Sequence, residues 1–296
     1  MNRSVKFEVA LFLPNGSTEL LALLGTELSQ SPSPATHSEW ARLANLNWIY
    51  LPMTCRDEAG FHSLAEALMG CRDFRGANIT NPFKTSALRL PGVSIDSSAE
   101  LCGAANTLYR GDDTAKPDWR LANTDVVGCS ESIQKILNYD RPLSIPKDKI
   151  LFVIFGSGAM ARTCCVAIEQ LESFAHSKQT IKLSRTELEL RKFDAICSFK
   201  PNSLVVINTL PTGTSPEADL LAFQTIETLD RLNVSARKYL FEVSYIKTKS
   251  CQLARSLLWT IVEGDVLFET QARASFKLWA RRPSPTQATA LTLSGE

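Results

Sequence analysis

The sequence predicts an α/β protein made of two domains, each with a mostly parallel sheet. Two observations support this fold class. Short apolar stretches rich in β-forming residues alternate with longer helical stretches, which is typical of parallel strands joined by helices. The chain also has 296 residues, of which 44% are hydrophobic, and this is enough to bury two separate cores.

In the first half, the expected strands are separated by two helical stretches. The strand over 76–80 must stop before Pro82, because proline cannot donate a ladder hydrogen bond. A polar loop over 111–118 predicts a hairpin between 107–109 and 119–122. The other expected elements are strands over 5–13, 20–24 and 48–52 and helices over 34–44 and 61–69.

In the second half, residues 150–155 form an apolar run without alternation, which indicates a strand buried on both faces. We expect strands over 180–183, 204–208, 239–243 and 260–262 to continue this sheet, and a helix over 270–281 to return to the first domain. The segment 138–149, which contains two prolines, resembles a linker. The predicted division is residues 1–124 with 265–296 in one domain and 125–264 in the other.

Composition excludes several classes of protein. The net charge is +1, without a basic segment, so nucleic acid is not an expected partner. No apolar run approaches the roughly 20 residues that span a membrane. The 8 cysteines lack CxxC spacing, so we expect neither structural zinc nor a disulfide framework, and no metal site. The N-terminal segment resembles a strand more than a signal peptide, which predicts a cytoplasmic location. The sequence leaves monomer and homodimer open.

A glycine motif follows the buried strand over 150–155 directly and opens a helix. It consists of Gly156, Ser157, Gly158 and Ala159, followed by Met160 and Ala161. The first glycine permits a tight turn, the second lets the backbone approach a pyrophosphate, and the helix N-terminus favours phosphate. The motif therefore predicts a Rossmann-like domain that binds a dinucleotide.

The end of the next strand distinguishes NAD from NADP. The strand over 180–183 runs into Ser184, Arg185 and Thr186, with no carboxylate before Glu187. An acidic residue would bind the ribose 2'-hydroxyl of NAD, whereas the planar guanidinium of Arg185 suits a 2'-phosphate. The sequence favours NADP, although Arg185 could also be an ordinary solvated arginine.

Several segments together resemble the shikimate dehydrogenase family in order and spacing, over about residues 20–283. The combination of NxTxPxK, GAxNT and NTD in this order is highly specific. The segments are 23–25, 29–37 with its SPSP turn, 76–84, 103–108, 123–125, the glycine motif, 184–186, 207–213, 241–245 and 264–271 with Phe276. The resemblance implies NADP-dependent, reversible reduction of 3-dehydroshikimate to shikimate, a step towards chorismate and the aromatic amino acids.

The resemblance also implies that Lys84 and Asp125 are the catalytic pair. Hydride transfer to a carbonyl carbon leaves negative charge on the oxygen, and a lysine ammonium can stabilise and protonate it. Asp125 can orient the amine. The residues alone would also allow a surface lysine and a helix-capping aspartate.

Polar residues are expected around a polyhydroxylated cyclohexene carboxylate. The family's carboxylate-binding serines fall on Ser31 and Ser33, with Tyr245 beside them, and its hydroxyl-binding positions on Thr80, Asn106 and Gln271. The resemblance places further cofactor contacts at Asn208 and Gly264. Read from the residues alone, the two serines could instead cap the helix that follows.

The sequence departs from the family pattern at several positions, and two kinds of alternative function remain. The departures are Gln30, Asn81, Ala159, Leu210, Glu242 and the pair Val266-Leu267. Some surround the expected nicotinamide position, so a quinate or aminoshikimate dehydrogenase is one alternative. A non-catalytic sensor of shikimate-like ligands is the other. The 3 histidines, His37, His62 and His176, resemble ordinary polar or half-buried residues.

Overall fold

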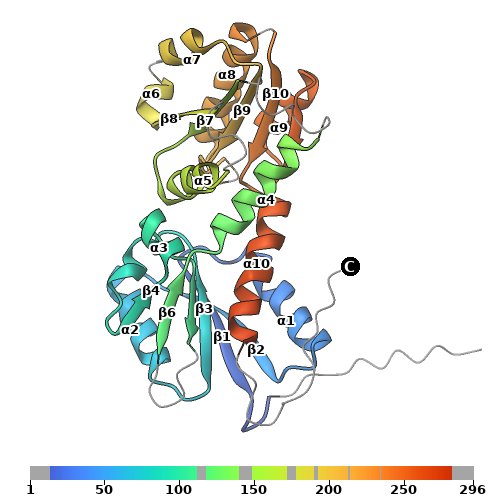
Figure 1. Cartoon of the computed structure of the whole chain (residues 1–296). Helices are drawn as coiled ribbons and strands as arrows, with labels where there is room; N and C mark the ends of the chain where they lie inside the picture. Colours follow the sequence, from blue (N-terminus) through green and yellow to red (C-terminus); the bar gives the residue numbers. More distant parts are fainter. Residues whose placement is uncertain are drawn as a thin grey trace, which may run out of the picture.

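A computed structural model of the chain describes residues 14–111, 118–139, 149–171, 178–189, 193–212, 214–233 and 235–281, which fold around two sheets (Figure 1). The predicted strand over 5–13 and His176 lie outside the described residues. The two sheets, with parallel strands in both and helices on their faces, confirm the predicted fold class.

The first sheet has six strands in the order β2-β1-β3-β5-β6-β4. Its strands are β1 (Glu19–Gly25), β2 (Trp48–Thr54), β3 (Phe74–Ile79), β4 (Val93–Ile95), β5 (Thr107–Arg110) and β6 (Trp119–Ala122). The strands β2, β1 and β3 are mutually parallel, and β5 and β6 form the predicted antiparallel hairpin. The three-residue strand β4 was not predicted.

Helices cover both faces of this sheet. They are α1 (Ser33–Leu43), α2 (Glu58–Met69), α3 (Ser97–Cys102) and the 3-10 helix η1 (Ser86–Arg89), together with the long α10 (Gly264–Ala280). Helix α2 begins where the Asp57 carboxylate accepts a hydrogen bond from the Gly60 amide at 2.8 Å. On the other face, Phe276 and Trp279 of α10 pack with Leu21 and Trp48.

The second sheet is entirely parallel, with five strands in the order β11-β10-β9-β7-β8. Its strands are β7 (Ile150–Phe155), β8 (Lys178–Leu183), β9 (Ser203–Asn208), β10 (Arg237–Glu242) and β11 (Thr260–Val262). Every residue of β7 and β9 is buried, as the uninterrupted apolar run of β7 predicts.

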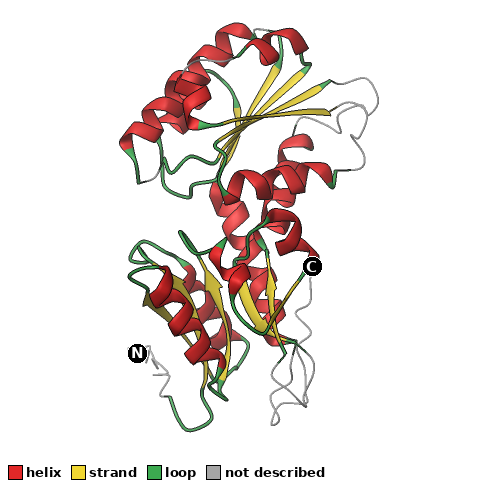
Figure 2. Ribbon diagram, turned by 90° about the vertical axis from the view of Figure 1, so that its left-hand side faces the viewer, coloured by secondary structure: helices red, strands yellow, loops and turns green. Residues whose placement is uncertain are grey.

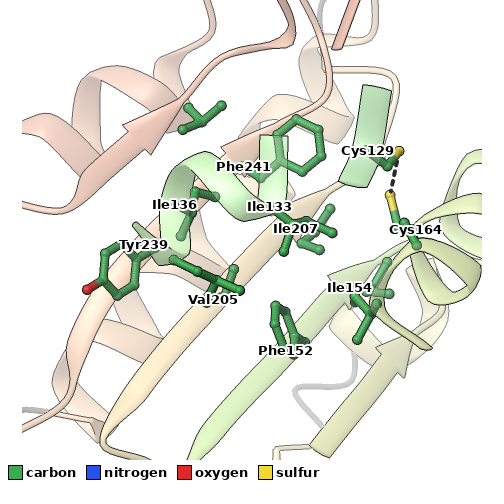
Figure 3. Packing of buried hydrophobic residues seen from close by; sticks show 14 of the residues in the cluster. Cys129, Ile133, Ile136, Phe152, Ile154, Cys164, Val205, Ile207, Tyr239 and Phe241 are labelled. Carbon is green, nitrogen blue, oxygen red and sulfur yellow. Dashed lines mark hydrogen bonds between the residues drawn. The ribbon is translucent and has the colours of Figure 1, made fainter. Parts of the chain in front are cut away.

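Both faces of the second sheet are covered as well (Figure 2). Helices α4 (Asp125–Leu137) and α5 (Ala159–Glu169) lie on one face, where Ile133 and Ile136 pack over Phe152 and Val205 (Figure 3). The other face carries α6 (Arg185–Glu189), α7 (Asp194–Phe199), α8 (Pro216–Leu232) and α9 (Lys249–Ser256). In the described residues, no helix has the length and apolar character to cross a membrane.

Helices α4 and α10 lie side by side between the two sheets (Figure 1). A Cβ atom at Gly128 would lie 2.7 Å from the Leu267 carbonyl oxygen, so glycine permits this close approach. Ile133 and Ile136 of α4 already pack on the second sheet, and most of the predicted linker over 138–149 lies outside the described residues. Helix α10 begins at Gly264, earlier than the predicted residue 270.

Candidate active site

Lys84 and Asp125 form a largely buried ion pair between the two domains. Lys84 follows β3 and Asp125 is the first residue of α4, and the Lys84 Nζ atom donates to Asp125 Oδ2 at 2.7 Å. Their side chains are only 15% and 5% exposed. Lys84 is therefore not a free surface lysine, and the Asp125 carboxylate binds an ammonium group.

A cavity of about 200 Å³ lies at this pair and draws its walls from both domains. All of the predicted catalytic and substrate-binding residues line it: Ser31, Ser33, Thr80, Lys84, Asn106, Asp125, Tyr245 and Gln271. The sequence-based set is thus brought together around one half-open cavity. Its polar atoms suit a small, highly oxygenated ligand.

On the first domain's side, Ser31 lies in the loop from β1 to α1, and Ser33 is the first residue of α1. The Ser31 hydroxyl accepts a hydrogen bond from the Ser33 amide at 3.3 Å, at the start of α1. The capping alternative is thus realised in part by Ser31, which also lines the cavity. No described side chain caps α1 at its Ncap position, Pro32.

The floor of the cavity is a buried hydrogen-bond network. The Asn106 side-chain carbonyl accepts from the Thr124 amide at 2.8 Å, and its Nδ2 donates to Gln271 Oε1 at 3.3 Å. Asn78, whose role was not predicted, accepts from the Tyr50 hydroxyl at 2.9 Å and donates to Ser275 at 3.1 Å. A satisfied network of this kind holds the amides in fixed orientations.

On the second domain's side, Tyr245 stands after β10 with its ring near Phe268, at 6.0 Å between centroids. Burial raises the pKa of Tyr245, and the nearby Lys84 ammonium opposes this shift in part. The phenol is therefore neutral at pH 7 and can donate a hydrogen bond into the cavity. Met160, directly after the glycine motif, also lines the cavity.

The glycine motif has the geometry of a phosphate site. Gly156 has φ +111°, and a Cβ atom there would lie 2.6 Å from Thr209 Oγ1, so the turn requires glycine. A Cβ atom at Gly158 would meet nothing within 4 Å, which leaves open space above the N-terminus of α5. No described side chain caps α5 and its first turn holds no acidic residue, so its amides fit a phosphate.

The remaining predicted cofactor residues lie at the carboxyl ends of neighbouring strands. Ser184 and Glu187 form a capping box at α6, in which the Ser184 amide donates to Glu187 Oε2 at 2.8 Å and the Glu187 amide donates to Ser184 Oγ at 3.3 Å. Arg185 is exposed and pairs with Glu189 at 3.1 Å, while Thr186 is exposed.

Asn208 and Gly264 have more crowded surroundings than the exposed Arg185 and Thr186. Asn208 Nδ2 donates to the buried Glu242 carboxylate at 2.8 Å. At Gly264, a Cβ atom would lie 2.3 Å from the Val243 carbonyl oxygen. Neither residue lines the cavity at Lys84.

Sequence reasoning missed several residues at the site. Glu27 and Met160 line the cavity, and both follow a predicted motif glycine closely, which was the signal available. Glu242 was noted only as a departure, yet it is fully buried and accepts hydrogen bonds from Asn208, Thr212 and Ser244.

His37 is also fully buried, so the half-buried interpretation was wrong.

The fold and the site define a two-domain protein of the dehydrogenase class, with a Rossmann-like domain and a site in the cleft. Residues 23–108 match the shikimate dehydrogenase substrate binding domain. The NADP(+) shikimate dehydrogenase of Microcystis aeruginosa is 28% identical over 92% of this chain and 94% of its own. The chain is thus similar to shikimate dehydrogenases along nearly its whole length, and to their substrate binding domain over residues 23–108.

Solved structures agree with this fold. A shikimate dehydrogenase crystallised with NADP+ has a TM-score of 0.68 at 21% identity, over 90% of this chain and 92% of that one. The shikimate dehydrogenase of Aquifex aeolicus has a TM-score of 0.67 at 21% identity, over 92% and 96% of the two chains.

Proposed function

We propose that this chain is an NADP-dependent shikimate dehydrogenase, which reversibly reduces 3-dehydroshikimate to shikimate. One observation carries the proposal: a single interdomain cavity holds the Lys84–Asp125 pair together with every predicted substrate-binding side chain. The relatives named NADP(+) shikimate dehydrogenases match nearly the whole chain and support the same activity.

The chemistry assigns a role to each member of the pair. During reduction the carbonyl oxygen gains negative charge, and the Lys84 ammonium donates a proton to it. Asp125 holds Nζ at 2.7 Å and balances its charge. Ser31, Ser33 and Tyr245 bind the substrate carboxylate through neutral donors, which do not compete with Lys84 for the carbonyl oxygen.

The residues present fit NADP, which when bound supplies or accepts the hydride. The open space at Gly158 and the uncapped start of α5 suit the pyrophosphate. Within the described part of the chain, Arg185 forms an exposed ion pair with Glu189 and lies near the exposed Glu217 carboxylate; both interactions are weak, so its guanidinium is available for the 2'-phosphate. Glu187, occupied by its capping box, is a poor partner for the 2'-hydroxyl of NAD.

Each of the two sheets belongs to a domain with its own proposed binding role. Residues 1–124 and 265–296 form the substrate domain in this proposal, and residues 125–264 bind NADP. We place the enzyme in the cytoplasm, as a monomer or homodimer. Light scattering on the purified protein would measure its oligomeric state.

An absorbance assay at the NADPH band tests the proposal. Shikimate, quinate and an amino-substituted shikimate are each supplied with NADP+ or NAD+. The proposal expects turnover of shikimate with NADP+ and clear preference for this combination. Faster turnover of another ring acid would contradict the substrate assignment. Tight ligand binding without any turnover would contradict the enzyme assignment and favour a sensor.

A further inference from the structure

The glycine motif and the catalytic pair are joined by a continuous chain of hydrogen bonds that runs through Thr163. On α5, the Thr163 hydroxyl donates to the Ala159 carbonyl oxygen, at the glycine motif, at 3.1 Å. The same hydroxyl oxygen accepts from Asn123 Nδ2 at 3.2 Å. One buried hydroxyl thus touches both the nucleotide-binding helix and the segment that precedes α4.

The chain continues from Asn123 to Lys84. The Asn123 Oδ1 atom accepts from the Asp125 amide at 3.1 Å, and Asp125 Oδ2 accepts from Lys84 Nζ at 2.7 Å. The linking side chains are secluded, because Asn123 and Thr163 are each 1% exposed and Asp125 is 4% exposed. Water therefore does not replace these contacts readily. A shift in the position of one group moves the group that is hydrogen-bonded to it.

A second connection runs in parallel through Arg162, the neighbour of Thr163. Its Nε donates to the Cys102 carbonyl oxygen at 2.9 Å, and its Nη2 lies 3.3 Å from both the Gly103 carbonyl oxygen and Thr85 Oγ1. The cation sits at the C-terminus of α3, where a positive charge is favourable. Thr85 directly follows Lys84, so this connection ends beside the other member of the pair.

We propose that Thr163 and Arg162 are positioning residues, which transmit the seating of the cofactor on the glycine motif to the Lys84–Asp125 pair. The inference rests on the proposed function and adds a role for α5 within it. Neither residue touches the cavity. Their effect is exerted through Asn123, which accepts a hydrogen bond from the Asp125 amide, and through Thr85, the sequence neighbour of Lys84.

The first test is kinetic and uses a matched set of variants. Thr163→Val keeps the shape but removes the hydrogen bonds to Ala159 and Asn123 and the one to the Cys102 side chain, whereas Thr163→Ser keeps the hydroxyl. Thr225→Val is the control, because Thr225 is also buried and, among the described residues, its hydroxyl donates within α8 to the Leu221 carbonyl oxygen. We expect Thr163→Val to lower kcat about tenfold, with the KM for NADPH almost unchanged, since small misplacement of reacting groups is costly. Thr163→Ser and Thr225→Val should remain near wild type.

An unchanged kcat in Thr163→Val, or an equal loss in Thr163→Ser, would overturn the role of the hydroxyl. Should Thr163→Val fail to fold, Arg162→Ala removes the parallel connection. It should show the same split between kcat and KM, while Arg231→Ala, an exposed arginine on α8, should not. A wild-type kcat in Arg162→Ala would overturn the second connection.

The second test does not depend on turnover. Amide hydrogen exchange is measured with and without NADP+ alone, in the absence of substrate. We expect NADP+ to slow exchange over residues 123–126 in the wild type and Thr163→Ser, and to leave it unchanged in Thr163→Val. Failure of NADP+ to bind the wild type would contradict the proposed function itself. Binding that protects the glycine motif but not residues 123–126 would contradict only the connection through Thr163.

Discussion

Lys84 donates a hydrogen bond to Asp125, which lies 41 positions later in the sequence. The two side chains meet at the start of α4, directly after the last strand of the first sheet along the chain. The pair lies at the boundary of the two domains, so neither domain builds it alone. Asp125 is also held by its own amide, which donates to the Asn123 side chain at 3.1 Å, and Lys84 lies five residues after the end of β3.

Removal of the Lys84 ammonium should act on turnover. We expect Lys84→Ala to lower kcat by roughly 10²-fold or more, the usual size of a general acid contribution, with a much smaller change in substrate affinity. Asp125→Asn should also lower kcat, and the double variant should lose less than the sum, because the pair acts as a unit. Steady-state kinetics of the four proteins measures this. A near-normal kcat with a raised KM in Lys84→Ala would make the lysine a binding residue.

The two glycines of the phosphate site should fail in different ways. In Gly158→Ala the new methyl group meets no protein atom, so Tm should hold while the KM for NADPH rises. In Gly156→Ala the methyl group collides with Thr209 and φ +111° is strained, so Tm should fall as well. Thermal melts and kinetics on both variants separate the two effects. An unchanged KM for NADPH in Gly158→Ala would place the phosphates elsewhere.

Arg185 should govern the choice of cofactor. We expect Arg185→Ala to raise the KM for NADPH strongly and leave the KM for the ring acid nearly unchanged, because the 2'-phosphate is distant from the chemistry. Arg231→Ala, another exposed arginine of the second domain, is the control. Kinetics with NADPH and NADH check the result. Equal losses with the two cofactors would exclude a contact with the 2'-phosphate.

Glu242 should make stability depend on pH. Burial raises its pKa from 4.5 to about 7, against the opposing hydrogen bonds from Asn208 and Ser244. Between these values the folded protein binds a proton that the unfolded chain lacks, so the free energy of unfolding falls as pH rises, by up to about 1.4 kcal/mol per pH unit. Glu242→Gln should remove this contribution, so in urea titrations from pH 5 to 7 the free energy of unfolding of the variant should rise relative to that of the wild type as pH rises. Parallel curves for the two proteins would contradict the assignment.

His37 should act in the opposite direction. Burial among aromatic rings, with Tyr50 stacked at 4.7 Å, lowers its pKa from 6.5 to about 3. Between these values only the unfolded chain binds the proton, so the free energy of unfolding falls as pH falls. His37→Phe should remove this contribution, so in urea titrations from pH 4 to 6.5 the free energy of unfolding of the variant should fall relative to that of the wild type as pH rises. Because the windows of His37 and Glu242 overlap, the wild type should vary less with pH there than either variant, and a steeper wild type would refute this.

Much of the fold followed from local pattern. The apolar run of β7 predicted a doubly buried strand, and the glycines after it predicted the turn into α5. Helix α4 was not predicted as an element, because Val126, Val127 and Gly128 have low helix propensity. Its packing on both the second sheet and α10 favours the helix.

The sequence predicted which residues belong to the site, but not the distances and contacts between them. The order of the motifs selected Ser31, Lys84 and Asp125, and the structure places them on one cavity. Pattern could not reveal Thr163 or Glu242, because their importance depends on partners far away in sequence. A buried hydroxyl and a buried carboxylate resemble solvated residues until the fold shows which polar groups face them.

The return of α10 to the first sheet has a consequence for the order in which the protein can mature during synthesis. Phe276 and Trp279 complete the core around Leu21 and Trp48, yet they leave the ribosome after every strand of both sheets. The second sheet can close over α4 and α5 while the first still lacks part of its interior. The domain that begins first along the chain is therefore finished last, and until then its apolar face is open to chaperones and proteases.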